Sequence, residues 1–153
     1  MIYQRLSIYL IKQFRCKSTM RVHRSKLLID VNDLCSLTIL IWVATMDDQV
    51  IAWCALEYFY PHPAYDHSAQ IAIYIYEDYR QQHLGRDLLT YAQKQIEDHL
   101  DIRTVIAYIY IENQASYHLF TSCGYKEWGK LPQISEINGQ MRSLYMMNRH
   151  FNE

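Results

Sequence analysis

The chain has 153 residues, of which half are apolar and one fifth are charged, with a formal net charge of −1. This length and hydrophobicity fit one domain over residues 1–153 with a sizeable buried core, and they exclude a disordered chain. No apolar run approaches the roughly 20 residues that a membrane-spanning helix needs, so we expect no membrane partner.

Cysteine and glycine usage narrows the class of protein further. The four cysteines are scattered without a CxxC pair, which favours buried thiols in a reducing, cytoplasmic environment over a disulfide framework or a zinc site. We therefore expect no metal. The four glycines do not cluster, although dinucleotide-binding and P-loop sites need grouped glycines. Nicotinamide dehydrogenases and P-loop nucleotidases are therefore disfavoured.

The first 29 residues carry seven lysines and arginines and no acidic residue, whereas the remainder has eight basic and sixteen acidic residues. Such a start is typical of a nucleic-acid-binding arm, a membrane-surface helix or a transit peptide, and also of the solvated face of an ordinary helix. Ile2, Leu6, Leu10 and Phe14 recur near helical spacing, so we predict a basic helical start over residues 1–30. Basic and aromatic residues are not interleaved in a long block, and we expect no nucleic-acid partner.

Three segments of the first half have the composition of β-strands. The run Ile39–Met46 is followed by a turn at Asp47-Asp48 and by a second run over Val50–Phe59. After a proline-containing loop, strand character resumes at Gln70–Tyr76, where isoleucines alternate with other residues. These segments predict a β-hairpin followed by a third strand.

The second half alternates helices and strands. Apolar residues at every fourth position predict an amphipathic helix over Arg86–Leu100, and the apolar run Arg103–Ile111 predicts an internal strand covered on both faces. A second helix is predicted over Gln114–Cys123, because Gly124 stands where helices commonly end. Asn138-Gly139 between apolar segments predicts a closing hairpin. The predicted fold class is therefore α/β of the mixed α+β type.

The polar stretch Tyr79–Arg86 lies between a predicted strand and the helix that follows it. A loop that enters a helix directs free backbone N–H groups outward, and such groups favour an anionic phosphate. The alternative is a plain strand-to-helix connection in which one glycine allows a tight turn. The local pattern alone leaves both interpretations open.

Within this stretch, residues 80–86 resemble the pyrophosphate loop of the GCN5-related N-acetyltransferases (GNAT), whose pattern is R/Q-x-x-G-x-G/A. Arg80, Leu84 and Gly85 match it, and the helix continues with paired leucines at Leu88-Leu89. His83 stands where the first glycine is usual. A β-carbon therefore crowds the phosphate side there, and a positive φ is less comfortable.

Four further segments resemble the phosphinothricin (methionine sulfoximine) acetyltransferase branch of this family, in its order and spacing. They are a substrate-side loop at Ala64–Ala69, an N-x-x-S motif at Asn113–Ser116, an L-F-x-x-x-G-Y motif at Leu119–Tyr125 and a WGxLP hairpin at Trp128–Gly139. With the loop, the resemblance covers roughly residues 39–147. Ile2-Tyr3-Gln4 resembles the family's first helix, which leaves no residues for the opening edge strand. We expect that strand to be missing or the start of the chain to be remodelled.

The resemblance implies a central mixed, mostly antiparallel sheet flanked by helices, with a splayed pair of strands that admits the pantetheine arm of acetyl-CoA. An N–H near Ile73–Ile75 would hold the thioester oxygen as negative charge develops. Asn113 and Ser116 would contact the pantetheine or phosphate side, or would instead serve as helix cap and first-turn hydroxyl. The implied cofactor-binding set is Ile73, Tyr74, Ile75, Arg80, Gln81, Gln82, His83, Leu84, Gly85, Arg86, Asn113 and Ser116.

Acetyl transfer to an amine needs a base, because a primary amine is mostly protonated at neutral pH. Gln70 replaces the family's glutamate, and Phe120 replaces the histidine or tyrosine of the second helix. We predict that Gln70 orients a water or the amine, and that Glu57 and Tyr117 are candidates for handling the proton. Further candidates are Glu112, His62, His67, Tyr74, Tyr108 and Tyr110, the predicted substrate contacts are Tyr65 and His62, and Cys123 is interpreted as a buried thiol.

The preferred hypothesis is an acetyl-CoA-dependent N-acetyltransferase that moves the acetyl group directly to the amine of a small polar molecule, an amino acid or a phosphinothricin-like analogue. The replacements at Gln70, His83 and Phe120 motivate an alternative, a degenerate acyl-CoA-binding module without turnover. A third hypothesis is a basic-arm protein that docks on nucleic acid or an anionic surface through residues 5–26. The fourteen tyrosines would suit a homodimer.

Overall fold

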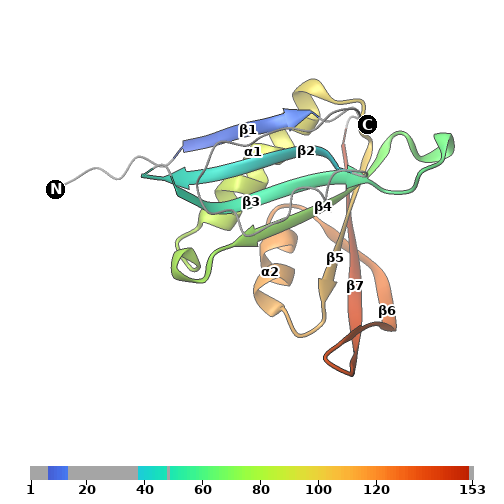
Figure 1. Cartoon of the computed structure of the whole chain (residues 1–153). Helices are drawn as coiled ribbons and strands as arrows, with labels where there is room; N and C mark the ends of the chain where they lie inside the picture. The colour runs from blue at the N-terminus through green and yellow to red at the C-terminus, as the bar shows by residue number, and fades with distance from the viewer. Residues whose placement is uncertain (1–6, 14–37, 48, 152–153) are drawn as a thin grey trace.

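The computed structural model describes residues 7–13, 38–47 and 49–151 (Figure 1). In this part of the chain, seven strands and two α-helices follow one another, with two single-turn 3-10 helices between them. The strands are β1 (Ser7–Gln13), β2 (Thr38–Met46), β3 (Gln49–Tyr58), β4 (Ser68–Ile75), β5 (Thr104–Tyr110), β6 (Lys126–Ile137) and β7 (Gln140–His150). The helices are η1 (Pro63–Tyr65), η2 (Glu77–Tyr79), α1 (Leu84–His99) and α2 (Gln114–Ser122).

The seven described strands form one sheet in the order β1-β2-β3-β4-β5-β7-β6. Every neighbouring pair is antiparallel except β4 and β5, which run parallel. Parallel neighbours need a crossover connection, and α1 provides it. The prediction of a mixed, mostly antiparallel sheet flanked by helices is therefore confirmed.

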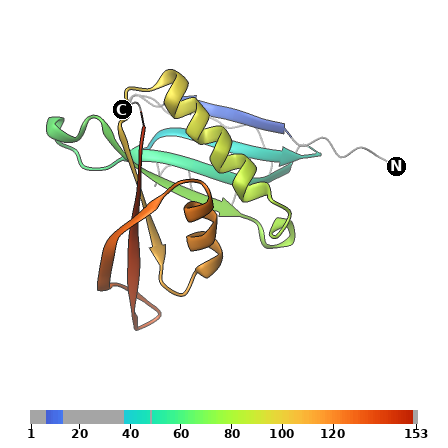
Figure 2. The same ribbon diagram turned by 180° about the vertical axis from the view of Figure 1, so that it is seen from behind.

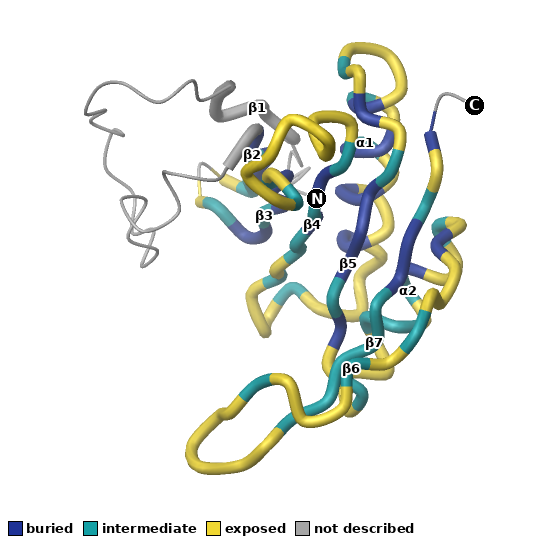
Figure 3. The backbone as a smooth tube through the Cα atoms, turned by 90° about the vertical axis from the view of Figure 1, so that its right-hand side faces the viewer, coloured by how far each residue is buried: buried dark blue, intermediate teal, exposed yellow. Residues whose placement is uncertain are grey.

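One face of the sheet, called the helix face below, carries the main core. Trp42, Cys54 and Ile71 on three strands are at most 2% exposed, and they belong to one apolar cluster with Leu88 and Ile96 of α1. Figure 2 shows α1 lying across β2, β3 and β4. In Figure 3 the buried residues gather along the middle strands and on α1, whereas the far end of the β6–β7 hairpin is exposed. The predicted amphipathic helix therefore packs as its pattern indicated.

The start of the chain differs from the prediction. Ser7–Gln13 forms the edge strand β1, antiparallel to β2, so a helix over these residues is wrong and the opening edge strand is present. The segment is rich in β-branched and aromatic residues, which favour strands. Pairing with β2 also satisfies backbone groups that an unpaired edge would leave open. Residues 1–6 and 14–30, with most of the basic residues, lie outside the described residues.

Turn residues end the elements where the sequence predicted. Gly124 follows α2 with a φ of 89°, and Asn138 and Gly139 turn the last hairpin with φ values of 51° and 74°. Glycine and asparagine tolerate this left-handed region better than other residues. Both helices lie within two residues of their predicted bounds.

Candidate active site

The strands β4 and β5 pair only at their starts. Their register matches Ser68–Gln70 to Thr104–Ile106, and beyond these residues the strands diverge into a fork (Figure 1). The N–H of Tyr76 donates to a carbonyl of β3 at 3.0 Å. Because successive N–H groups of a strand point to opposite sides, those of Ile73 and Ile75 point toward β5, which has diverged there. The predicted splayed pair is present, and backbone donors lie along its inner edge.

The loop between β4 and α1 turns through left-handed conformations. Gln81 and His83 have φ values of 61° and 62°, and His83 is the N-cap of α1 without a side-chain cap bond. The N–H of Arg86 donates to the His83 carbonyl at 2.9 Å. The N–H groups of Leu84 and Gly85 precede it and have no acceptor inside the helix. Donors at this helix start therefore remain available for an anion.

Arg80 and Gly85 connect this loop to the fork. Nε of Arg80 donates to the Ile75 carbonyl at 3.2 Å. A β-carbon added to Gly85 would lie 2.8 Å from Cδ1 of Ile75 and 3.1 Å from a methyl group of Leu119. Gly85 thus allows α1, β4 and α2 to approach one another closely, which is a packing role in addition to its free N–H group.

A groove of about 1130 Å³ joins the loop to the fork. All the predicted cofactor positions line it except Gln82, whose side-chain amide donates to the Asp78 carbonyl at 3.2 Å. Oδ1 of Asn113 accepts from the Ser116 N–H at 3.1 Å, so Asn113 caps α2 while also lining the groove. The structure therefore brings the predicted cofactor residues together, and for Asn113 it also shows the capping interaction.

Gln70 and Glu57 are direct cross-strand neighbours on β4 and β3. Side chains at such positions share one face, with Cβ atoms roughly 4.5–5.5 Å apart. Because Ile71 belongs to the core, Gln70 and Glu57 lie on the opposite side of the sheet, called the far face below. Glu57 is half-buried, and burial raises the pKa of its carboxyl above the ordinary range. A carboxylate thus stands beside the position where the resemblance places the family's base, at the closed end of the fork.

Tyr117 is not among the described residues that line the groove. Its hydroxyl donates to Oε2 of Glu127 at 3.2 Å, and its ring packs on Tyr145 with centroids 4.7 Å apart. The bond to Glu127 favours the protonated phenol and raises the pKa of Tyr117. Phe120 is 3% exposed in the core, so this position serves packing. The structure does not bring Tyr117 to the fork.

Some of the other proton-handling candidates on β4, on β5 and just after β5 line the groove, and one does not. Tyr74 and Tyr110 line the groove, whereas Tyr108 does not, and burial raises the pKa of the Tyr108 hydroxyl. Glu112 also lines the groove, but its Oε1 is 2.9 Å from Nη1 of Arg142. This hydrogen bond lowers the pKa of Glu112, which makes its carboxylate a weak base.

The predicted substrate contacts lie in the loop between β3 and β4, at the other end of β4 from the groove (Figure 1). Nδ1 of His62 accepts from the Ala64 N–H at 3.1 Å and so caps η1. The Tyr65 ring packs edge-on against neighbouring aromatic rings of the same loop. His67 lies 3.2 Å from the Asp101 carboxylate. The structure therefore gives His62 and Tyr65 local contacts and does not place them at the groove.

Sequence reasoning missed several residues that line the groove, among them His118, Ile137 and Arg142. Ile137 and Arg142 flank the Asn138-Gly139 turn, and β7 carries this end of the hairpin back to the end of β5. The turn signal predicted the hairpin, but only the long-range pairing of β5 with β7 brings it to the groove.

Among the described residues, no three histidine, cysteine, aspartate or glutamate side chains gather in a way that could hold a metal ion. No described helix is long and apolar enough to cross a membrane. Cys54 and Cys123 are free thiols, and burial raises the pKa of the Cys54 thiol. Cys54 is therefore a packing residue, and Cys123 is half-buried.

The mixed sheet, the fork and the donors at the start of α1 define an acyl-CoA-type transferase architecture. Residues 9–125, more than half of the chain, match the Acetyltransferase (GNAT) family. The chain therefore belongs to the GNAT acetyltransferase family.

Three similar proteins carry the name phosphinothricin acetyltransferase. The "Putative phosphinothricin acetyltransferase YwnH" of Bacillus subtilis (strain 168) is 39% identical over 100 residues, a match that spans 65% of this chain and 61% of that protein. The crystal structure of "a putative phosphinothricin N-acetyltransferase" is 36% identical, with a TM-score of 0.69 over 74% of this chain and 72% of that one. A phosphinothricin acetyltransferase from Sinorhizobium meliloti in complex with acetyl-CoA shares the fold, with a TM-score of 0.69 at 21% identity over 73% of this chain and 60% of that one.

Proposed function

We propose that the protein is an N-acetyltransferase that moves the acetyl group of acetyl-CoA directly to the amine of a small polar molecule. One observation carries this proposal: a single groove joins the free donors at the start of α1 to the unpaired inner edge of β4. The first feature suits a diphosphate, and the second suits an extended arm that ends in a thioester.

In this proposal the loop binds the diphosphate. The N–H groups of Leu84 and Gly85 donate to it, and the helix dipole favours its negative charge. The Arg86 side chain adds a positive charge at the same wall of the groove. Arg80 is held by the Ile75 carbonyl and so orients the loop against β4.

The inner edge of β4 would stabilise the transition state. The N–H of Ile73 or Ile75 would donate to the carbonyl oxygen on which negative charge develops during attack by the amine. These donors are fixed by the pairing of β4 with β3 on its other side, so little reorganisation accompanies the reaction. The electron pair of the breaking C–S bond leaves with the sulfur as a thiolate, which takes a proton from water, and no acyl-enzyme forms.

Glu57 is the proposed general base, acting through water. Its half-buried carboxyl lies beside Gln70, and its raised pKa makes it a better proton acceptor than an ordinary carboxylate. Gln70 would orient the water or the amine between Glu57 and the fork. The similarity to phosphinothricin acetyltransferases supports an amino acid or a phosphinothricin-like analogue as the acceptor.

A thiol-release assay with acetyl-CoA and a panel of L-amino acids and phosphinothricin tests this function, together with calorimetric titration of acetyl-CoA. We expect 1:1 binding and amine-dependent thiol release, and Gln70→Glu should raise the rate. Binding without release by any amine would favour the alternative, an acyl-CoA-binding module, which Gln70 and Phe120 motivate. Absence of both binding and release would contradict the proposal.

A homodimer is a further proposal, supported by the outer edge of β6. Among the described strands, β6 has a neighbour on one side only, and its Trp128 and Ile134 are 49% and 59% exposed. Long exposed edges with apolar side chains favour pairing with another chain. Sedimentation velocity should give twice the chain mass of 18.4 kDa, and a single monomeric species would contradict a dimer.

A further inference from the structure

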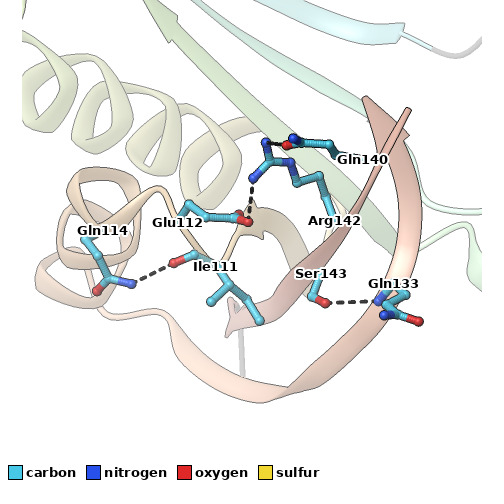
Figure 4. Close-up of polar contacts among 7 residues, drawn as sticks. All are labelled: Ile111, Glu112, Gln114, Gln133, Gln140, Arg142 and Ser143. Carbon is cyan, nitrogen blue, oxygen red and sulfur yellow. Dashed lines mark hydrogen bonds and ion pairs between the residues drawn. The ribbon is translucent and has the colours of Figure 1, made fainter. Parts of the chain in front are cut away.

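A polar cluster lies where the β6–β7 hairpin meets the end of β5 (Figure 4). Nη1 of Arg142 donates to Oε1 of Glu112 at 2.9 Å, and Nη2 donates to Oε1 of Gln140 at 2.7 Å. The Arg142 side chain is 33% exposed, and both Arg142 and Glu112 line the groove. The cluster is therefore an arginine held in place at the wall of the groove.

Arg142 belongs to the far face of the sheet. Met147 of β7 lies in the core on the helix face, so alternation places the even-numbered residues of β7, Arg142 among them, on the far face. Tyr74 of β4 and Tyr110 of β5 lie on the same face by the same alternation, and they also line the groove. The groove thus passes through the fork, from the loop and α2 on the helix side to an aromatic opening beside Arg142.

The arginines that line the groove come from two parts of the fold. In the described part of the chain they are Arg80 and Arg86 at the loop, and Arg142 on β7. The proposed function assigns the loop end to the diphosphate, so an acceptor would enter from the far face and meet Arg142. The cofactor assignment does not use Arg142, although this residue lines the groove.

The hydrogen bonds of Arg142 leave it capacity for a ligand. A guanidinium has five N–H donors in a fixed fork, and two of them are engaged by Glu112 and Gln140. Held on two sides, the guanidinium is preoriented, and its planar geometry matches a carboxylate. The Glu112 carboxylate partly neutralises the charge of the Arg142 guanidinium. Recognition of a ligand by Arg142 therefore depends on directed hydrogen bonds more than on long-range attraction.

We propose that Arg142 binds the carboxylate of the acceptor, so that the acceptors are amines that also carry an acid group. The inference rests on the proposed function, because it takes the far face as the acceptor side. The Tyr74 and Tyr110 rings would flank the acceptor, and its amine would point into the fork toward the inner edge of β4.

Two acceptors that differ only in their acid group distinguish a binding role of Arg142 from an effect on folding, because misfolding would slow the reaction of both. The wild type is compared with Arg142→Gln in the thiol-release assay, using the amino acid that reacts fastest and the carboxamide of the same amino acid. We expect the wild type to prefer the acid, and the variant to lose about 10- to 100-fold in kcat/KM for the acid with little change for the amide. The loss should fall mainly on KM.

Two further variants separate binding from a structural role. Arg142→Lys keeps the charge without the planar fork, so it should lose part of the preference for the acid. Arg103→Gln, whose guanidinium lies outside the groove and 4.0 Å from Asp101, should leave the preference unchanged.

An equal loss for acid and amide in Arg142→Gln would show that the cluster only fastens the hairpin, and would overturn the inference. A wild type that accepts amides as well as acids would overturn it too. Either result leaves the proposed function intact as long as acetyl-CoA binds in calorimetry. A wild type without acetyl-CoA binding would instead end the proposed function.

Discussion

Replacing His83 by glycine should stabilise the fold. His83 has φ 62° and ψ −2°, the left-handed region, where a β-carbon costs roughly 1–2 kcal/mol. Removing the β-carbon relieves this cost, but about 0.5–1 kcal/mol of the gain is lost because glycine has more conformational freedom in the unfolded chain. We therefore expect a net gain of about 0.5–1 kcal/mol in the free energy of unfolding. In a domain of this size, that gain raises Tm by about 1–4 °C.

Urea and thermal denaturation of His83→Gly and His83→Ala separate the backbone effect from loss of the imidazole. Alanine keeps the β-carbon and therefore the strain, so His83→Ala should show no gain. Gln81→Gly offers a second test, because Gln81 has a φ of 61° and should respond in the same direction. Equal stability of His83→Gly and His83→Ala would refute the backbone argument.

The same substitution should strengthen cofactor binding. Removing the β-carbon lets a phosphate approach the N–H groups of Leu84 and Gly85 more closely. Calorimetric titration should therefore give a lower Kd for acetyl-CoA in His83→Gly than in His83→Ala. A Kd in His83→Gly that is equal to or higher than the Kd in His83→Ala would contradict the argument that the β-carbon crowds the phosphate.

Three other substitutions test the base, the close approach at the loop, and an unpaired amide. Glu57→Gln should lower kcat by about 10²- to 10⁴-fold. Only the ionised carboxylate accepts a proton, and burial raises the pKa of Glu57, so wild-type kcat/KM should fall as the pH drops through that raised pKa. Glu57→Gln should lack this fall at low pH. A wild-type pH profile in the variant would place the base elsewhere. Gly85→Ala puts a methyl group 2.8 Å from Cδ1 of Ile75, so it should destabilise the fold by about 1–3 kcal/mol and weaken acetyl-CoA binding. An unchanged denaturation curve and an unchanged Kd would contradict the packing role of Gly85. Asn148 is 3% exposed, and its Oδ1 has no hydrogen-bond partner in the part of the chain that the structure describes. Asn148→Leu should therefore leave Tm equal or higher, and a large drop in Tm would show that the amide is needed for packing.

Much of the fold follows from local patterns in the sequence. The four-residue apolar spacing of α1, the glycine after α2 and the Asn138-Gly139 turn each encode their element within a few residues. Ser7–Gln13 is the exception, because the helical spacing of Ile2, Leu6, Leu10 and Phe14 runs across it, whereas its strand state depends on pairing with β2. The partner strand begins only at Thr38, so the pairing leaves no signal within Ser7–Gln13 itself.

The residues of the site also differ in how directly the sequence predicts them. The loop that ends at Arg86 is contiguous in sequence, so its motif could be recognised directly. The pairing of Glu57 with Gln70 depends on the register of β3 and β4, and the place of Arg142 depends on β7 returning beside β5. For these residues the sequence supplies candidates, and the sheet decides which of them meet.

The most direct test of the proposed function is the backbone amide NMR spectrum during titration with acetyl-CoA. Binding in the groove predicts the largest shifts at Leu84 and Gly85, from the diphosphate, and at Ile73 and Ile75, from the thioester arm. Free phosphate should reproduce only the first pair. If saturating acetyl-CoA leaves these four amides unmoved, the groove does not bind the cofactor and the acetyltransferase assignment of this site is contradicted.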